Sequence, residues 1–214
     1  MRYSISVFLI ALMLIFGFHS KAEAFGLGVY GSSGSGSADW DREFWDGSSY
    51  KNEKDSKYST FGFVMDTAVA KNTLFNYRLS VGSVDLKYEP GDCCATYELE
   101  GIVFDNDFGF ALIRKEKFRL WIGPELRIGF YEGEIKGSSP KIDIDMVEVG
   151  LGPVIGANFH LGSVVTLSLK AGLLSTEAYA TQSDISGYPD ADIDISGSHT
   201  FANLALIFRL GDNY

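Results

Sequence analysis

The sequence predicts an all-β fold, an eight-stranded antiparallel transmembrane β-barrel with short periplasmic turns and longer external loops. The first observation is the segment Lys117–Tyr131, KFRLWIGPELRIGFY, in which apolar residues of one parity alternate with polar or small residues of the other. This period-two alternation is typical of a strand with one apolar face. The segment is long enough for a tilted strand that crosses a bilayer, which needs about 9–11 residues in the hydrocarbon. The other observations are that this pattern recurs along the chain and that the connections between the segments alternate between short and long.

The strands are expected in the following order. The first is weak, because Phe25–Tyr30 is short and rich in glycine, and the fifth is Lys117–Tyr131 itself. A helix is disfavoured for the fifth segment because Pro124 would interrupt it. The remaining six expected strands are Thr60–Val69, Leu74–Lys87, Tyr97–Ile113, Ile142–Phe159, Val165–Leu173 and Ala202–Leu210.

The connections predict how the barrel is oriented. Three of them are expected to be tight turns and four to be longer loops, and this asymmetry is expected of outer-membrane barrels, whose external loops are the longer ones. Both termini then lie on the turn side. The expected turns are Lys71–Thr73, Arg114–Glu116 and His160–Ser163, and the expected loops are Ser32–Lys57, Pro90–Cys94, Glu132–Pro140 and Thr176–Pro189.

The first 24 residues read as a secretory signal peptide. Arg2 precedes an apolar run, Val7–Phe18, and Ala22-Glu23-Ala24 forms an A-x-A cleavage pattern. The run is short for a membrane anchor, which is the alternative. We therefore expect a signal peptide at 1–24 and one outer-membrane barrel domain at 25–214. The formal net charge of −10 disfavours nucleic acid as a partner.

Alternation alone does not say which face points outward. A secreted barrel of the lipocalin kind would turn its apolar face inward around a ligand. The polar face here is rich in glycine, serine, threonine and asparagine, with a few charges of both signs, which suits a narrow lumen in which charges are paired. The apolar face carries aromatic residues near the turns, including Phe25, Phe75 and Phe208, as in the aromatic girdle at a membrane interface. We therefore expect the apolar face to contact lipid.

On this architecture, residues 25–214 resemble the small eight-stranded outer-membrane barrels of the OmpA, OmpX and OmpW kind. The resemblance implies a porin-like protein in the outer membrane of a Gram-negative cell, without a cofactor, in contact with outer-membrane lipid and lipopolysaccharide. It also implies insertion by the barrel-assembly machinery, which generally reads a last strand that ends in an aromatic residue. Phe208 and Tyr214 are the candidates for that residue, although Gly211-Asp212-Asn213 lies between them.

A set of charged residues shares the parity that we assign to the lumen. Buried charges must pair, since an unpaired one costs several kcal/mol. The set therefore predicts a salt-bridged plug, because eight strands leave an interior just wide enough for side chains; a path for ions or small solutes is the alternative. Its members are Asp66, Arg78, Asp105, Asp107, Arg119, Glu125, Arg127, Glu148, Lys170 and Arg209.

Other candidate sites lie toward the expected loops. Trp40, Phe44 and Trp45 stand among charges in the first loop and are expected to form a surface contact, because exposed aromatic residues often mark recognition. An alternative is that these rings pack on the barrel rim. Cys93 and Cys94 are a possible disulfide, although adjacent Cα atoms lie about 3.8 Å apart and a bridge between them would be strained. Bridges to another chain and free thiols remain alternatives.

Metal binding and catalysis are both disfavoured. Asp190, Asp192 and Asp194 begin like a calcium loop, but Ile195 and Phe201 stand where glycine and glutamate are required, so a solvated strand extension is preferred. Some outer-membrane barrels are lipid A deacylases with a Ser/His pair. Ser198 and His199 are neighbours in a strand, however, and their side chains point to opposite faces.

The sequence thus predicts a non-enzymatic outer-membrane barrel with a structural or surface-interaction role, whose external partner it does not name. A narrow channel for small apolar or ionic solutes and a lipid A-modifying enzyme are the alternatives.

We expect the mature protein to begin at Phe25, because cleavage should follow Ala24. Intact-mass measurement of protein extracted from the membrane tests this. A mass that includes residues 1–24 would contradict the assignment.

Overall fold

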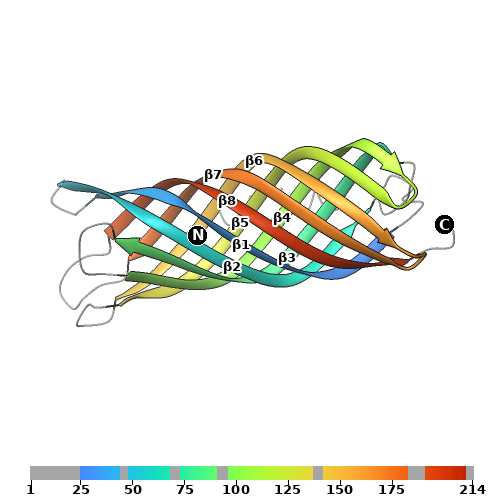
Figure 1. Ribbon diagram of the computed structural model, residues 1–214. Helices are drawn as coiled ribbons and strands as arrows, with labels where there is room; N and C mark the ends of the chain where they lie inside the picture. Colours follow the sequence, from blue (N-terminus) through green and yellow to red (C-terminus); the bar gives the residue numbers. More distant parts are fainter. Residues whose placement is uncertain are drawn as a thin grey trace, which may run out of the picture.

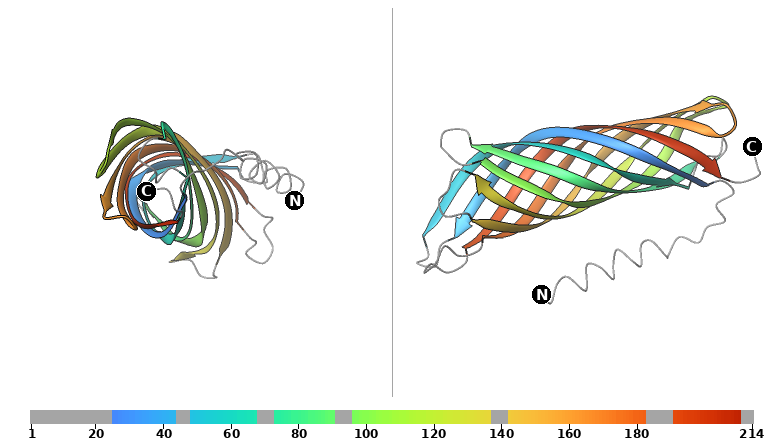
Figure 2. Two further views of the ribbon diagram at one scale, coloured as in Figure 1. Left: turned by 90° about the vertical axis from the view of Figure 1, so that its right-hand side faces the viewer. Right: turned by 90° about the horizontal axis from the view of Figure 1, so that it is seen from below.

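The barrel predicted from the sequence is confirmed. In the computed structural model, antiparallel strands close into a barrel in which β1 (Phe25–Glu43) pairs with both β2 (Ser49–Asp66) and β8 (Ala191–Leu210) (Figure 1). Viewed along its axis, the barrel wall forms a closed ring (Figure 2). Among the residues that the structure describes, no helix is long and apolar enough to cross a membrane. The described residues are 25–43, 48–67, 73–90, 96–136, 142–182 and 191–210.

The strands are longer than the sequence pattern indicated. The predicted loop Ser32–Lys57 is wrong, because β1 and β2 remain paired from Gly26↔Asp66 to Glu43↔Ser49. The outward residues of this stretch are polar, which is typical of loops but is also what a strand presents above a membrane. The strands are β1 (Phe25–Glu43), β2 (Ser49–Asp66), β3 (Phe75–Pro90), β4 (Thr96–Lys115), β5 (Phe118–Lys136), β6 (Asp143–Leu161), β7 (Val165–Gln182) and β8 (Ala191–Leu210).

The two ends of the barrel differ. At one end, here called the turn end, β4 connects to β5 and β6 connects to β7, the second turn containing Gly162 at a positive φ of 76°. The first residue of β1 pairs with the last residue of β8 at this end, Phe25↔Leu210. The opposite end, here called the loop end, carries the connections β1–β2, β3–β4, β5–β6 and β7–β8 (Figure 1).

An apolar belt surrounds the outside of the barrel next to the turn end. The exposed fractions of Phe61 and Phe63 on β2 are 69% and 73%, and large exposed apolar residues also lie on each of the remaining strands. Soluble proteins rarely expose apolar patches beyond a few hundred Å², whereas a lipid-facing band about 25 Å tall is the rule in outer-membrane barrels. The belt therefore faces lipid, and the soluble alternative with its apolar face turned inward is excluded.

The polarity of both barrel faces inverts above this belt. On β4 the outward residues are acidic at Glu98 and Glu100 and become apolar from Ile102 onward, while the inward residues are apolar as far as Val103 and acidic at Asp105. The inversion occurs without a change of parity, because successive strand residues still point to opposite faces. The barrel thus has a lipid-spanning part with a polar interior and, above it, an extension with an apolar interior and a polar exterior.

One polar side chain interrupts the lipid-facing side of β4. Asn106 lies between Phe104 and Phe108, yet it is buried. The Tyr77 hydroxyl donates to Asn106 Oδ1 at 2.7 Å, and Asn106 Nδ2 donates to the carbonyl of Leu126 at 3.3 Å. A polar group that faces hydrocarbon must have partners, and these two bonds supply them.

The face assignment can be tested on a single strand. Leu169 and Ser175 both point outward on β7, the first inside the belt and the second above it. We expect Leu169→Arg to destabilise the folded barrel by about 2–4 kcal/mol, because it places a charge in lipid, whereas Ser175→Arg should be nearly neutral. Urea unfolding in lipid vesicles measures both. Equal tolerance of the two variants would mean that the belt is misplaced.

Candidate functional site: the closed lumen

The ten charged residues predicted for the lumen are all buried inside the barrel. The acidic members are Asp66, Asp105, Asp107, Glu125 and Glu148, and the basic members are Arg78, Arg119, Arg127, Lys170 and Arg209. Acids and bases are equal in number, so their formal charges cancel. Neutrality of this kind is what a low-dielectric interior requires, since an uncompensated buried charge is strongly destabilising.

The ion pair nearest the turn end joins two neighbouring strands. Arg78 on β3 donates through Nη2 to Asp66 Oδ2 on β2 at 2.8 Å. The same nitrogen reaches across the lumen to Ser168 Oγ at 2.9 Å and to Asn158 Oδ1 at 3.3 Å. One guanidinium therefore connects β2 and β3 to β6 and β7 on the far wall, which blocks the bore at this level.

A second group of charges fills the middle of the lumen. Lys170 Nζ on β7 lies 3.0 Å from Asp107 Oδ1 and 2.6 Å from Glu125 Oε2. Beside it, Arg127 Nε donates to Asp105 Oδ1 at 2.7 Å, and Arg127 Nη2 lies 3.8 Å from Glu125 Oε1. Glu125 thus stands between the two cations. Asp105 on β4 is thus the acidic partner of Arg127 on β5.

Three further members of the set make hydrogen bonds to uncharged groups. Arg119 donates to Thr73 Oγ1 at 3.1 Å and to Asn76 Oδ1 at 3.2 Å. Arg209 donates to the carbonyls of Gly162 and Val165 in the β6–β7 turn region. Glu148 accepts a bond from the Tyr131 hydroxyl at 3.1 Å. These contacts tie the network to the barrel wall at both of its ends.

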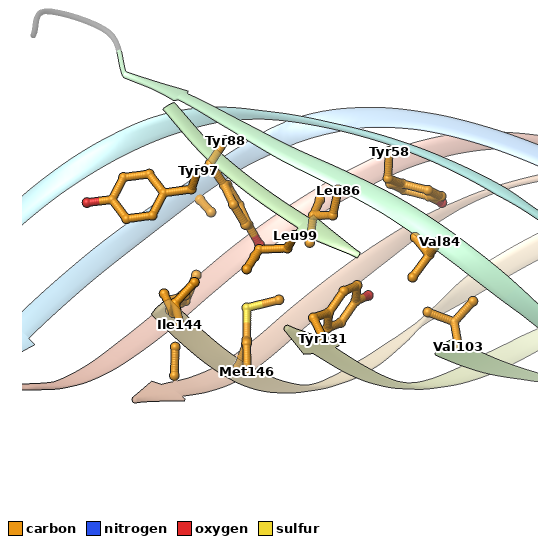
Figure 3. Close-up of a cluster of buried hydrophobic side chains, with 14 of the residues drawn as sticks. Tyr58, Val84, Leu86, Tyr88, Tyr97, Leu99, Val103, Tyr131, Ile144 and Met146 are labelled. Carbon is orange, nitrogen blue, oxygen red and sulfur yellow. The ribbon is translucent and has the colours of Figure 1, made fainter. Parts of the chain in front are cut away.

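An apolar core fills the lumen above the charges. Figure 3 shows part of it, with Leu86, Leu99 and Met146 converging from different strands. Tyr58 marks the boundary, because the Arg127 guanidinium carbon lies 4.7 Å from the centroid of its ring. The aliphatic and aromatic side chains of this core are close-packed rather than arranged around an open bore, since each is at most 8% exposed. Within the described part of the chain, side chains therefore fill the lumen from the ion pairs of the lipid-spanning part to the apolar core above them.

Contrary to the prediction, Trp40 does not lie on a surface loop. It is an inward-facing residue of β1 and only 4% exposed, so it belongs to the apolar core of the lumen. The reason is that β1 continues past the membrane with its parity unchanged. The other two residues of the predicted contact, Phe44 and Trp45, lie outside the described residues, as do Cys93 and Cys94.

The remaining candidate residues lie on β8, where successive side chains point alternately out of the barrel and into it. Asp192 and Asp194 are exposed on the outer face of β8. In the described part of the chain, no group of three or more His, Cys, Asp or Glu residues is arranged to hold a metal ion. Ser198 is exposed on the outside of β8, while His199 is buried inside, edge-on to Tyr58 at 5.7 Å between ring centroids. The Ser/His pair of a deacylase is therefore not assembled from these two residues.

Several inward residues of the loop-end extension were not predicted as lumen residues. They include Lys54, Tyr58, Tyr88 and Tyr97. Their parity was a usable signal, because each lies an even number of residues from a charged lumen residue on the same strand. Polar outward neighbours mask this signal, because they make these stretches resemble loops.

Removing one partner of the central network should leave a buried charge unpaired. We expect Arg127→Met to destabilise the barrel by about 3–5 kcal/mol and Asp105→Asn to recover much of that loss in the double variant, because the uncompensated carboxylate is then gone. A double-mutant cycle by urea unfolding measures the coupling. Arg127→Met combined with Asp66→Asn is the matched control, since Asp66 pairs with Arg78, and its effects should add. Zero coupling between positions 127 and 105 would contradict the network.

Comparison with known proteins supports the fold and no more specific assignment. No protein-family model and no curated protein matches the sequence. Among solved structures, the outer membrane protein OprG from Pseudomonas aeruginosa is similar with a TM-score of 0.65 at 10% identity, over 90% of this chain and 98% of that one. The outer membrane protein AlkL gives a TM-score of 0.47 at 13% identity over 87% and 92% of the two chains. The outer membrane protease OmpT from Escherichia coli gives 0.37 at 10% identity over 89% and 98%. The chain therefore has the fold of the small outer-membrane β-barrel proteins.

Proposed function

We propose that this protein is a non-enzymatic, non-conducting outer-membrane barrel that presents a rigid acidic platform at the cell surface. The observation that carries the proposal is the filled lumen, in which ion pairs occupy the lipid-spanning part and a packed apolar core occupies the extension above it. A pore for water-soluble solutes needs a hydrated bore, and these side chains leave none. The surface of the extension is then the part of the molecule that is available to partners.

The outer surface of the extension is strongly acidic on the β4–β6 side. A groove runs over these three strands at the loop end, and six carboxylate side chains line it. A surface that carries one sign of charge raises the local concentration of oppositely charged partners and accelerates their association. The partner that this surface favours is therefore cationic. The six acidic residues are Glu98, Glu100, Glu132, Glu134, Asp143 and Asp145.

The length of the strands supports a role in presentation. β1 and β2 continue together as far as Glu43↔Ser49, well beyond the apolar belt. An apolar core such as the one inside this extension holds side chains in single rotamers at crystal-like density. The outer ends of the strands are thereby held above the membrane as a stiff surface, which lowers the entropy lost when a partner binds.

The apolar interior of the extension favours a second candidate function, the uptake of small apolar molecules. Side chains such as Leu99, Met146 and Ile193 would give such a molecule a suitable environment. The molecule would have to displace packed side chains and then leave the lumen above the ion pairs of Lys170 and Arg127. Faster uptake of a small naphthalene dye by cells that express the protein than by cells that lack it would favour this candidate.

Planar-bilayer recording separates a filled lumen from a channel. We expect the refolded mature protein to produce no unitary conductance steps, because the lumen is closed by buried ion pairs. The same detergent without protein is the control. Steps that appear in the wild-type protein, and whose size changes in Glu125→Gln, would place an ion path through the network and overturn the proposal.

A further inference from the structure

His199 is buried inside the extension, above the apolar belt. It points inward from β8 and is only 2% exposed, while its neighbours Ser198 and Thr200 face outward. Both neighbours are polar and exposed, whereas the belt on this strand begins at Leu204, so His199 lies above the lipid. Its imidazole ring is edge-on to the ring of Tyr58 on β2, with 5.7 Å between ring centroids.

The imidazole of His199 makes no hydrogen bond. Among the described residues, no donor or acceptor bonds to its Nδ1 or Nε2. The positions opposite it in the sheet supply none, because they are Gly36 on β1 and Leu174 on β7. The other histidine of the described chain, His160, differs in this respect, since its Nδ1 lies 2.9 Å from Thr166 Oγ1. A buried polar group without a partner is costly, and for His199 the uncharged imidazole is the least costly form.

The charges around His199 oppose a proton on its ring. The Arg127 guanidinium carbon on β5 lies 4.7 Å from the centroid of the Tyr58 ring, so this ring contacts both Arg127 and His199. A proton on His199 would add a second positive charge near this guanidinium. Each buried acid at this level bonds to a donor other than His199. The other charged side chains that face this part of the interior are Lys54, Asp105, Glu125, Glu148 and Lys170.

His199 must therefore stay uncharged for the core around it to stay packed. In water a histidine takes up a proton near pH 6.5. A protonated ring has two N–H donors and a charge, and the packed core offers it neither an acceptor nor a counter-charge, so burial disfavours this form. If the core opens and the ring reaches water, the proton binds readily. The opened form binds protons better than the packed form, so a fall in pH favours opening.

We propose that His199 makes the extension acid-sensitive, so that its core loosens in an acidic medium while the barrel wall below stays closed. The loosening starts at the wall formed by β1, β2 and β8, because His199 and Tyr58 meet there. The surface of the extension is then rigid at neutral pH and mobile in acid. This inference goes beyond the proposed surface role, because it concerns the condition under which the surface is rigid and not what binds to it.

The test is hydrogen–deuterium exchange of the full mature barrel in lipid vesicles, read by mass spectrometry on peptides of β8. Protection factors at about pH 7 and about pH 4.5 are compared, each relative to the intrinsic exchange rate at that pH. His199→Gln keeps a polar side chain that does not titrate. We expect acidification to lower protection around position 199 at least about tenfold more in the wild-type protein than in His199→Gln. The upper limit is about 100-fold, because the lower pH lies about two units below the ordinary pKa of histidine. Carboxylates titrate in both proteins, so their effect cancels in this comparison.

His160→Gln is the matched control, since it removes the other buried histidine, and it should behave as the wild-type protein does. Peptides that contain Phe61 and Phe63 in the belt should stay protected at both pH values. If His199→Gln does not fold, His199→Leu is measured in the same way. An equal loss of protection in the wild-type protein and the folded His199 variant overturns the proposal, as does a loss that extends to the belt. Bilayer recording at neutral pH is independent of this test.

Discussion

Charge pairing inside the lipid-spanning part is the interaction on which the rest of the structure depends. A β-strand has two faces, and in lipid one of them must be apolar, so the charged side chains of this part are directed into the lumen. Eight strands leave little room there, and the charges must neutralise one another at short range. Arg78 with Asp66, Arg127 with Asp105, and Lys170 with Asp107 and Glu125 meet that requirement by linking strands that are adjacent or face each other across the bore.

Above the membrane, residues still alternate between the inward and the outward face, but the polarity of the two faces is reversed. Water now lies outside, so inward residues such as Leu99 and Met146 form an apolar core, and outward residues become polar, with a concentration of acids over β4, β5 and β6. The strands therefore continue as one rigid element through two solvents, each of which selects a different face for apolar residues. The filled lumen and the polar exterior of the extension both follow from this arrangement.

Much of the lipid-spanning part could be predicted from the sequence, because its alternation is local and strong. The alternation of apolar residues in Lys117–Tyr131 predicted a strand, the face that this strand turns outward and the contact of that face with lipid. The charged residues of the opposite face lie in the lumen. The extension could not be recognised in the same way, because a polar outward face and a glycine-rich stretch such as Gly31–Ser37 are also typical of loops. Trp40 was misplaced for that reason. The contacts of Trp40 with Tyr88 and Tyr97 could not be predicted from the sequence, since they depend on the mutual register of β1, β2, β3 and β4, which are paired through contacts distant in the chain.

The inversion of polarity along one strand can be measured directly on β6. Single cysteines replace Asp143, Asp145, Val147 and Val149, which share the outward face, in a background of Cys93→Ser and Cys94→Ser. Each cysteine carries a nitroxide spin label, and its collision rates with oxygen and with a water-soluble nickel chelate are compared in lipid vesicles. We predict that the nickel chelate dominates at positions 143 and 145 and that oxygen dominates at 147 and 149. The same solvent at all four positions would contradict the account, because the outward face of β6 would then not cross from lipid into water.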